Sequence, residues 1–145
     1  MLKIKRLLVL MLVVVTTMGM GQTAFHEYRN MQRWDGFYEE WTPLVTDMPS
    51  PVIVKITKGT DSFFVSFRMD ESIYNYILEY DETGHTYSGQ KYYSYSVFGE
   101  ESYISCSRSM SDMANGFKSY IKIVYLDENF NVQGMLLYND GDEAY

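Results

Sequence analysis

Short turn-forming segments separate the apolar runs of this chain, and their length restricts how the runs can pair. Asp and Asn side chains in such segments bond back to the backbone, and Gly adopts positive φ. A parallel crossover needs about a dozen residues or more, so connections this short join antiparallel neighbours. The sequence therefore predicts a meander of β-hairpins. The turn segments are Lys58–Asp61, Asp70–Ser72, Asp81–Gly84, Gly99–Glu101 and Asp127–Asn131.

The runs between the turns alternate with the period of two that is typical of half-buried strands. In one of them Phe63, Val65 and Phe67 share one face, and Arg68 lies on the other. The wholly apolar face is the one expected to enter the core. We predict an all-β, antiparallel domain of about eight strands, at Phe37–Trp41, Val52–Lys58, Ser62–Met69, Ile73–Tyr80, Tyr92–Phe98, Ser102–Ser109, Tyr120–Leu126 and Val132–Tyr138.

Three segments interrupt this pattern. Pro43 to Pro51 contains three prolines, which cannot donate to a central ladder, so it is expected to be a longer loop or an edge crossing. Met110 to Gly116 is expected to form one helical turn that begins at Ser111 or Asp112. Thr23 to Arg33 fits either a short N-terminal helix or an ordered arm.

A meander of eight strands hides its edges either by closing into an up-and-down barrel or by splitting into a two-sheet β-sandwich. The hairpin order favours the barrel. Gly36-Phe37-Tyr38 opens the first expected strand. With the overall layout, it resembles the lipocalin-like family of small secreted β-barrels, although Tyr38 stands where the Gly-x-Trp signature of that family has Trp. The resemblance implies a barrel that holds an apolar ligand.

The first 21 residues have the composition of an export signal. A basic start at Lys3, Lys5 and Arg6 precedes the apolar run from Leu7 to Val15. Small glycines then stand where signal peptidase cleaves, and the run is shorter than the roughly 20 apolar residues of a transmembrane helix. We predict a signal peptide at 1–21 and a single β domain at 22–145. The mature protein is expected to be secreted or periplasmic, in a bacterium, without stable membrane insertion.

The net charge limits the classes of partner that the mature chain can bind. The segment 1–21 carries three of the 12 basic residues and none of the 19 acids, so the mature chain has a net charge of −10. Such a surface repels nucleic acid and anionic membranes.

The single cysteine, Cys106, rules out a disulfide within the chain. It alternates with Ile104 and Arg108 in a strand-like run, so we expect a buried, unpaired thiol.

No catalytic motif or cofactor site is found in the sequence. The only histidines are His26 and His85, and neither stands in metal-ligand spacing or beside a nucleophile motif. We therefore predict a binding protein rather than an enzyme, with no cofactor and no metal.

Two binding hypotheses remain. In the first, a barrel interior holds a small apolar or amphipathic ligand, with Arg68 or Glu39 as a polar contact if its face points inward. In the second, exposed tyrosines bind a glycan or a protein, because a Tyr ring combines a flat apolar face with a hydroxyl. The candidate ligand-binding residues are Glu39, Trp41, Arg68, Tyr76, Tyr93 and Tyr95.

Overall fold

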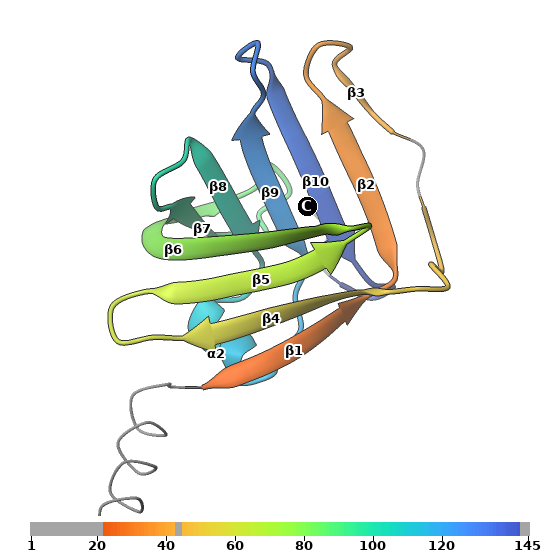
Figure 1. The fold of residues 1–145 in the computed structure, drawn as a ribbon. Helices are drawn as coiled ribbons and strands as arrows, with labels where there is room; N and C mark the ends of the chain where they lie inside the picture. The colour runs from red at the N-terminus through yellow and green to blue at the C-terminus, as the bar shows by residue number, and fades with distance from the viewer. Residues whose placement is uncertain (1–21, 43–44, 143–145) are drawn as a thin grey trace, which may run out of the picture.

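The computed structural model describes residues 22–42 and 45–142, and these form one antiparallel sheet of ten strands with one short helix (Figure 1). The all-β class is confirmed. The expected signal peptide at 1–21 lies outside the described residues. The strands are β1 (Thr23–Tyr28), β2 (Asn30–Asp35), β3 (Glu40–Trp41), β4 (Val52–Lys58), β5 (Phe63–Met69), β6 (Ser72–His85), β7 (Lys91–Val97), β8 (Ser102–Cys106), β9 (Ile121–Leu126) and β10 (Val132–Tyr138), and the helix is α2 (Met110–Ala114).

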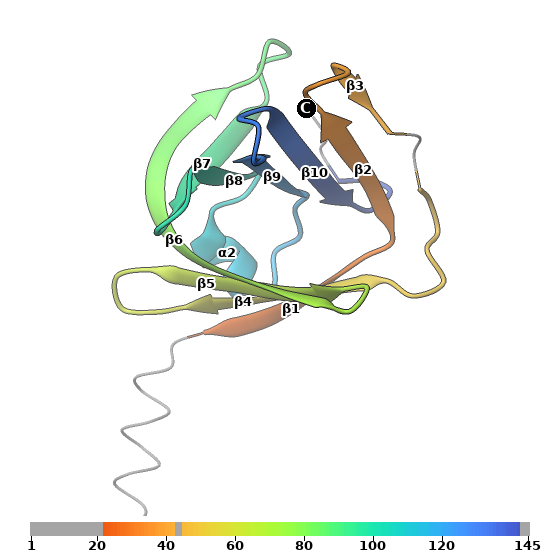
Figure 2. The ribbon, with the colours of Figure 1, turned by 45° about the horizontal axis from the view of Figure 1, so that its top comes forward.

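The sheet is not a closed barrel, which corrects the predicted architecture. Its strand order is β1-β4-β5-β6-β7-β8-β9-β10-β2-β3, with β1 and β3 as open edges. Only Arg29 separates β1 from β2, so these two strands continue one another end to end and cannot pair side by side. The sheet therefore curls without closing, and Figure 2 shows β1, β4 and β5 lying across the base while β9, β10 and β2 stand above them. We call the concave side of this curled sheet the trough.

The joint between β1 and β2 is held by the side chain of Asn139, which follows β10. Its Nδ2 donates to the carbonyl oxygen of Glu27 at 2.6 Å, and its Oδ1 accepts from the backbone N–H of Arg29 at 3.0 Å. One amide side chain thus replaces a neighbouring strand at the point where the chain turns from one part of the sheet into the other.

Two strands appear where the sequence indicated a helix or an arm, because Thr23 to Arg33 forms β1 and most of β2. The predicted strand Phe37–Trp41 is mostly a turn. The Asp35 carboxylate accepts from the backbone N–H of Phe37 at 2.9 Å, which leaves only β3 extended. The predicted turn at Asp81–Gly84 is part of β6, which continues past an irregularity in its pairing with β7 between Tyr80 and Glu82.

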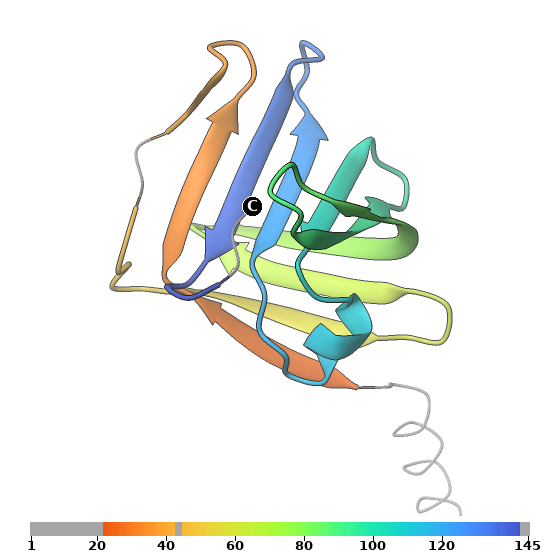
Figure 3. The same ribbon diagram turned by 180° about the vertical axis from the view of Figure 1, so that it is seen from behind.

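One end of the trough is filled. Apolar side chains from every strand except β3 and from α2 form one core, and α2 packs against β4 and β1 at this end (Figure 3). The predicted helical turn is confirmed, but it begins earlier than expected, because Ser109 is the N-cap and its Oγ accepts from the Asp112 N–H at 3.1 Å. The Tyr95 hydroxyl accepts from the buried Met110 N–H at 2.8 Å. Cys106 is fully buried with a free thiol, as predicted.

Residues 45–51 of the proline-rich segment are irregular, as predicted, apart from an isolated bridge between Val45 and Met31, and Pro43 lies outside the described residues. No helix among residues 22–42 and 45–142 is long and apolar enough to cross a membrane.

Candidate ligand-binding pocket

The end of the trough opposite α2 is hollow. A cavity of about 770 Å³ lies there, open to solvent, and is lined by side chains from β2, β6, β9, β10 and the hairpin ends around them. We call it the trough pocket. Alternation places Tyr74 and Tyr76 of β6 on the concave side, whereas Ile73 and Asn75, on the other face of β6, border the cavity near the start of that strand. Its lining residues are Arg33, Met69, Ile73, Tyr74, Asn75, Tyr76, Glu100, Glu101, Ser102, Ile123, Tyr125, Leu126, Asp127, Phe130 and Met135.

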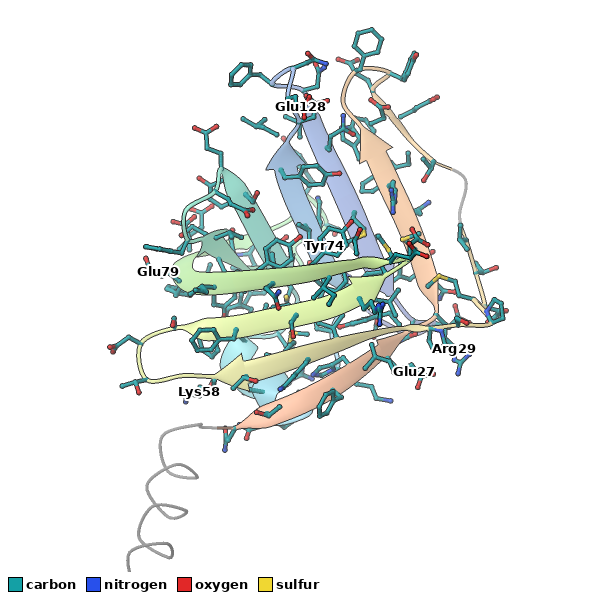
Figure 4. The ribbon with its side chains drawn as sticks, in the orientation of Figure 1. Glu27, Arg29, Lys58, Tyr74, Glu79 and Glu128 are labelled. Atoms are coloured by element: carbon teal, nitrogen blue, oxygen red, sulfur yellow. The ribbon has the colours of Figure 1, made fainter. Side chains whose placement is uncertain are left out.

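Stacked aromatic rings form one wall of the trough pocket. The ring of Phe67 lies 5.0 Å from that of Tyr74, with an angle of 18° between the planes, and 6.1 Å from that of Tyr76 at 30°. Tyr74 and Tyr76 are two residues apart on β6 and therefore share its concave face; Figure 4 labels Tyr74 on that strand. Phe67 itself is buried, so the two tyrosines present the stack to the cavity.

Arg33 is the positively charged residue in the lining of the trough pocket. The sequence pattern placed it only at the end of a helix or arm. Arg33 lies opposite Met135 in the register of β2 with β10, and its Nη2 is 3.8 Å from the Met69 sulfur. Within residues 22–42 and 45–142 Arg33 forms no ion pair. Its guanidinium therefore remains available to solvent or to a ligand.

Arg68 is not in the trough, so the hypothesis of an inward Arg68 is wrong. It lies opposite Ile73 on the convex face and is exposed, because Val65 and Phe67 on the other face of β5 fill the core. The expectation that the wholly apolar face is the buried one is confirmed for these two residues.

Carboxylates occupy another side of the pocket mouth. Glu100 and Glu101 lie in the connection between β7 and β8, and the hydroxyl of Ser102 donates to the Glu100 carboxylate at 3.5 Å. Burial, with smaller contributions from the nearby Glu100, Tyr74 and Tyr125, raises the pKa of Tyr76 to about 12. Tyr76 is therefore a neutral phenol at neutral pH.

Asp127 has a structural role at the same mouth. Its carboxylate accepts from the backbone N–H groups of Asn129 and Asn131, both at 2.9 Å, and from Gln133 Nε2 at 3.1 Å. Hydrogen bonds, first that of Asn131, lower the pKa of this carboxyl below its ordinary value. Asp127 thus fixes the hairpin between β9 and β10 while adding a negative charge to the pocket.

The other predicted site residues are dispersed. Of the six predicted ligand-binding residues, Tyr76 is the one that lines the trough pocket. Tyr95 is buried in the filled end, and the Lys91 ammonium lies 5.1 Å from the centre of the Tyr93 ring. Glu39 is exposed in the turn before β3, with a φ of 51°.

Trp41 lies on the convex face, where its ring is 5.6 Å from that of Trp34 in an edge-to-face arrangement. Gly134 lies between them and β9 in the sheet, opposite Trp34 in register. A second hollow of about 370 Å³ borders the two tryptophans and Gly134. The absence of a side chain at Gly134 therefore leaves an aromatic depression on the outside of the sheet.

The two histidines are far apart. His26 is buried, and its Nε2 lies 2.7 Å from the carbonyl oxygen of Met113, to which it donates, whereas His85 ends β6 on another part of the sheet. In the part of the chain that the structure describes, no group of three or more His, Cys, Asp or Glu side chains could hold a metal ion.

Comparison with protein-family models, with curated proteins and with solved structures gives no match to this chain.

Proposed function

We propose that this protein is exported and binds a small amphipathic ligand in the trough pocket without catalysing a reaction on it. The observation that carries the proposal is the uneven filling of the trough. One end is packed around α2, and the other retains a cavity of about 770 Å³. Cavities of roughly 300–1,000 Å³ with mainly apolar walls and a few polar groups are typical of small-molecule sites.

The chemistry of the lining supports an amphipathic rather than a purely apolar ligand. Met69, Ile123 and Met135 offer apolar and polarizable surface, while Arg33 and Glu100 place charge at the cavity. A ligand that buries its apolar part on the methionines and keeps a polar group near these charges satisfies both. This is also the function that the resemblance to lipocalin-like proteins implies, although the sheet here is open.

Native mass spectrometry of protein purified from its own host tests the proposal directly, since a retained small molecule adds a discrete mass. A titration with an apolar fluorescent probe adds a structural control. Met135→Trp fills the cavity and is expected to reduce probe uptake, whereas Ile53→Trp adds the same bulk to an exposed position on β4, away from the cavity. Equal uptake by the two variants and the parent would contradict the proposal.

A glycan site is the second candidate function, and the aromatic depression at Trp34 and Trp41 favours it. Aromatic rings beside a depression suit stacking on a sugar. The tyrosines favour it less, because Tyr93 and Tyr95 face the trough while Tyr87 and Tyr92 border a different hollow. A glycan array probed with the parent and with Trp41→Ala is the test. If neither protein bound any glycan on the array, or if both bound equally, this candidate would be eliminated.

A further inference from the structure

The mouth of the trough pocket brings together three tyrosines and a glutamate from separate elements. Tyr74 and Tyr76 come from β6, Tyr125 from β9, and Glu100 from the connection between β7 and β8. Tyr125 lies opposite Ser102 in register, and the Ser102 hydroxyl donates to Glu100 at 3.5 Å. Three tyrosine side chains and one carboxylate thus line one cavity.

This combination suits an organic cation. The face of an aromatic ring carries negative charge density, so an ammonium group is attracted to it, and several rings around one cation form the aromatic cages that bind quaternary ammonium groups. Burial raises the pKa of Tyr76, so its ring remains an uncharged phenol at neutral pH. A nearby carboxylate adds direct charge attraction, which is stronger in a cavity partly shielded from water.

Arg33 taken alone favours an anionic ligand, because a guanidinium binds a carboxylate through two hydrogen bonds. The balance of charges opposes it. The lining contains the three carboxylates of Glu100, Glu101 and Asp127 against the single guanidinium, and the whole chain carries a net charge of −7. An anion would have to enter through this negative field, while a cation is drawn into it.

We propose that the ligand of the trough pocket is an amphipathic organic cation. Its ammonium group lies against Tyr74, Tyr76 and Tyr125 beside Glu100, and its apolar part lies along Met69 and Met135. This inference rests on the proposed function, because it specifies the class of molecule that the same cavity takes.

Calorimetric titration with three amphiphiles of identical dodecyl chain, each below its micelle concentration at physiological salt, tests the head-group preference. The probes are dodecyltrimethylammonium, dodecyl maltoside and dodecanoate. The cation is expected to bind roughly tenfold tighter than the neutral maltoside, and the anion most weakly. Equal binding of all three would overturn the cation subsite and leave ligand binding intact. Tightest binding of dodecanoate would assign the head group to Arg33, and no binding of any probe would overturn both proposals.

Two matched pairs of variants separate a local subsite from the general acidity of the protein. Glu100→Gln and Glu79→Gln remove the same charge, but Glu79 is exposed on the convex face of β6, where Figure 4 labels it. Tyr74→Leu and Tyr103→Leu remove the same ring, and Tyr103 is exposed on the convex face of β8. Only the Glu100 and Tyr74 variants are expected to lower the affinity for dodecyltrimethylammonium, by about tenfold. Their affinity for dodecyl maltoside should stay unchanged. Equal losses within either pair would overturn the subsite.

Discussion

The hydrogen bond between Tyr95 and the first residue of α2 can be removed almost without changing shape. Tyr95→Phe deletes only the hydroxyl oxygen that accepts from the Met110 N–H. The edge-to-face contacts of its ring with Phe63 and Tyr80, both with centroids 5.8 Å apart, need only the ring and remain. The substitution therefore isolates one polar interaction in the filled end of the trough.

The expected cost follows from the burial of the donor. Met110 is fully buried, and its N–H is one of the first amides of α2, which have no partner within the helix. An unsatisfied buried donor costs about 1–3 kcal/mol. A loss of about 2 kcal/mol is a large part of the roughly 5–15 kcal/mol that stabilises a domain. For a domain of this size it lowers Tm by about 6–10 °C.

Urea unfolding and thermal denaturation, both followed by circular dichroism, measure this loss. The midpoint should fall while the slope m stays unchanged, since the surface exposed on unfolding is the same. Tyr103→Phe is the matched control, because Tyr103 is 49% exposed and its variant should stay within about 0.5 kcal/mol of the parent. If Tyr95→Phe were as stable as Tyr103→Phe, the account of how α2 is held would be wrong.

Further predictions concern titration, the thiol, capping and export. Burial raises the pKa of Tyr95 to about 12 and also raises that of Tyr28. The stability that these neutral phenols contribute is complete below about pH 10 and falls as the pH rises above that value, up to about 12 for Tyr95. Urea midpoints at about pH 9 and about pH 11 should show the fall, and Tyr95→Phe should show less of it. Cys106, whose pKa burial also raises, should react with a thiol dye slowly in native protein and rapidly in denaturant; fast native labelling would contradict its burial. Ser109→Ala should cost about 1 kcal/mol in the same urea assay, and no change would exclude the cap. N-terminal sequencing of exported protein should begin at or near Gln22, and an intact Met1 would refute the signal peptide.

Local patterns were sufficient to predict the hairpins and one face of the core. The turns Lys58–Asp61 and Asp70–Ser72 are short and β4 to β6 alternate cleanly, so strand direction follows, and Val65 and Phe67 are buried as expected. The Asp81–Gly84 segment has the composition of a turn but is strand, because an irregularity in the pairing of β6 with β7 lets the ladder continue to His85.

The first two strands were missed because their buried side chains include polar ones. His26 and Asn30 interrupt the apolar alternation, and each is satisfied by distant groups. Met113 accepts from His26 across 87 positions of the chain, and Asn30 accepts from the N–H of Asp47. Arg33 was missed for the same reason, since a residue can be assigned to the concave face only once β2 is recognised as a strand.

The single-residue joint at Arg29 sets the order in which the molecule can fold. The segment after the joint pairs with the last strand, and Asn139 reaches back to Arg29 across 110 positions. The register of β2 therefore cannot be fixed until the C-terminal strand has been synthesised. Contacts of such long range slow folding, typically to milliseconds or seconds. During translation β2 can pair with the neighbouring β3, but its pairing with β10 must wait until residues 132–138 have been synthesised.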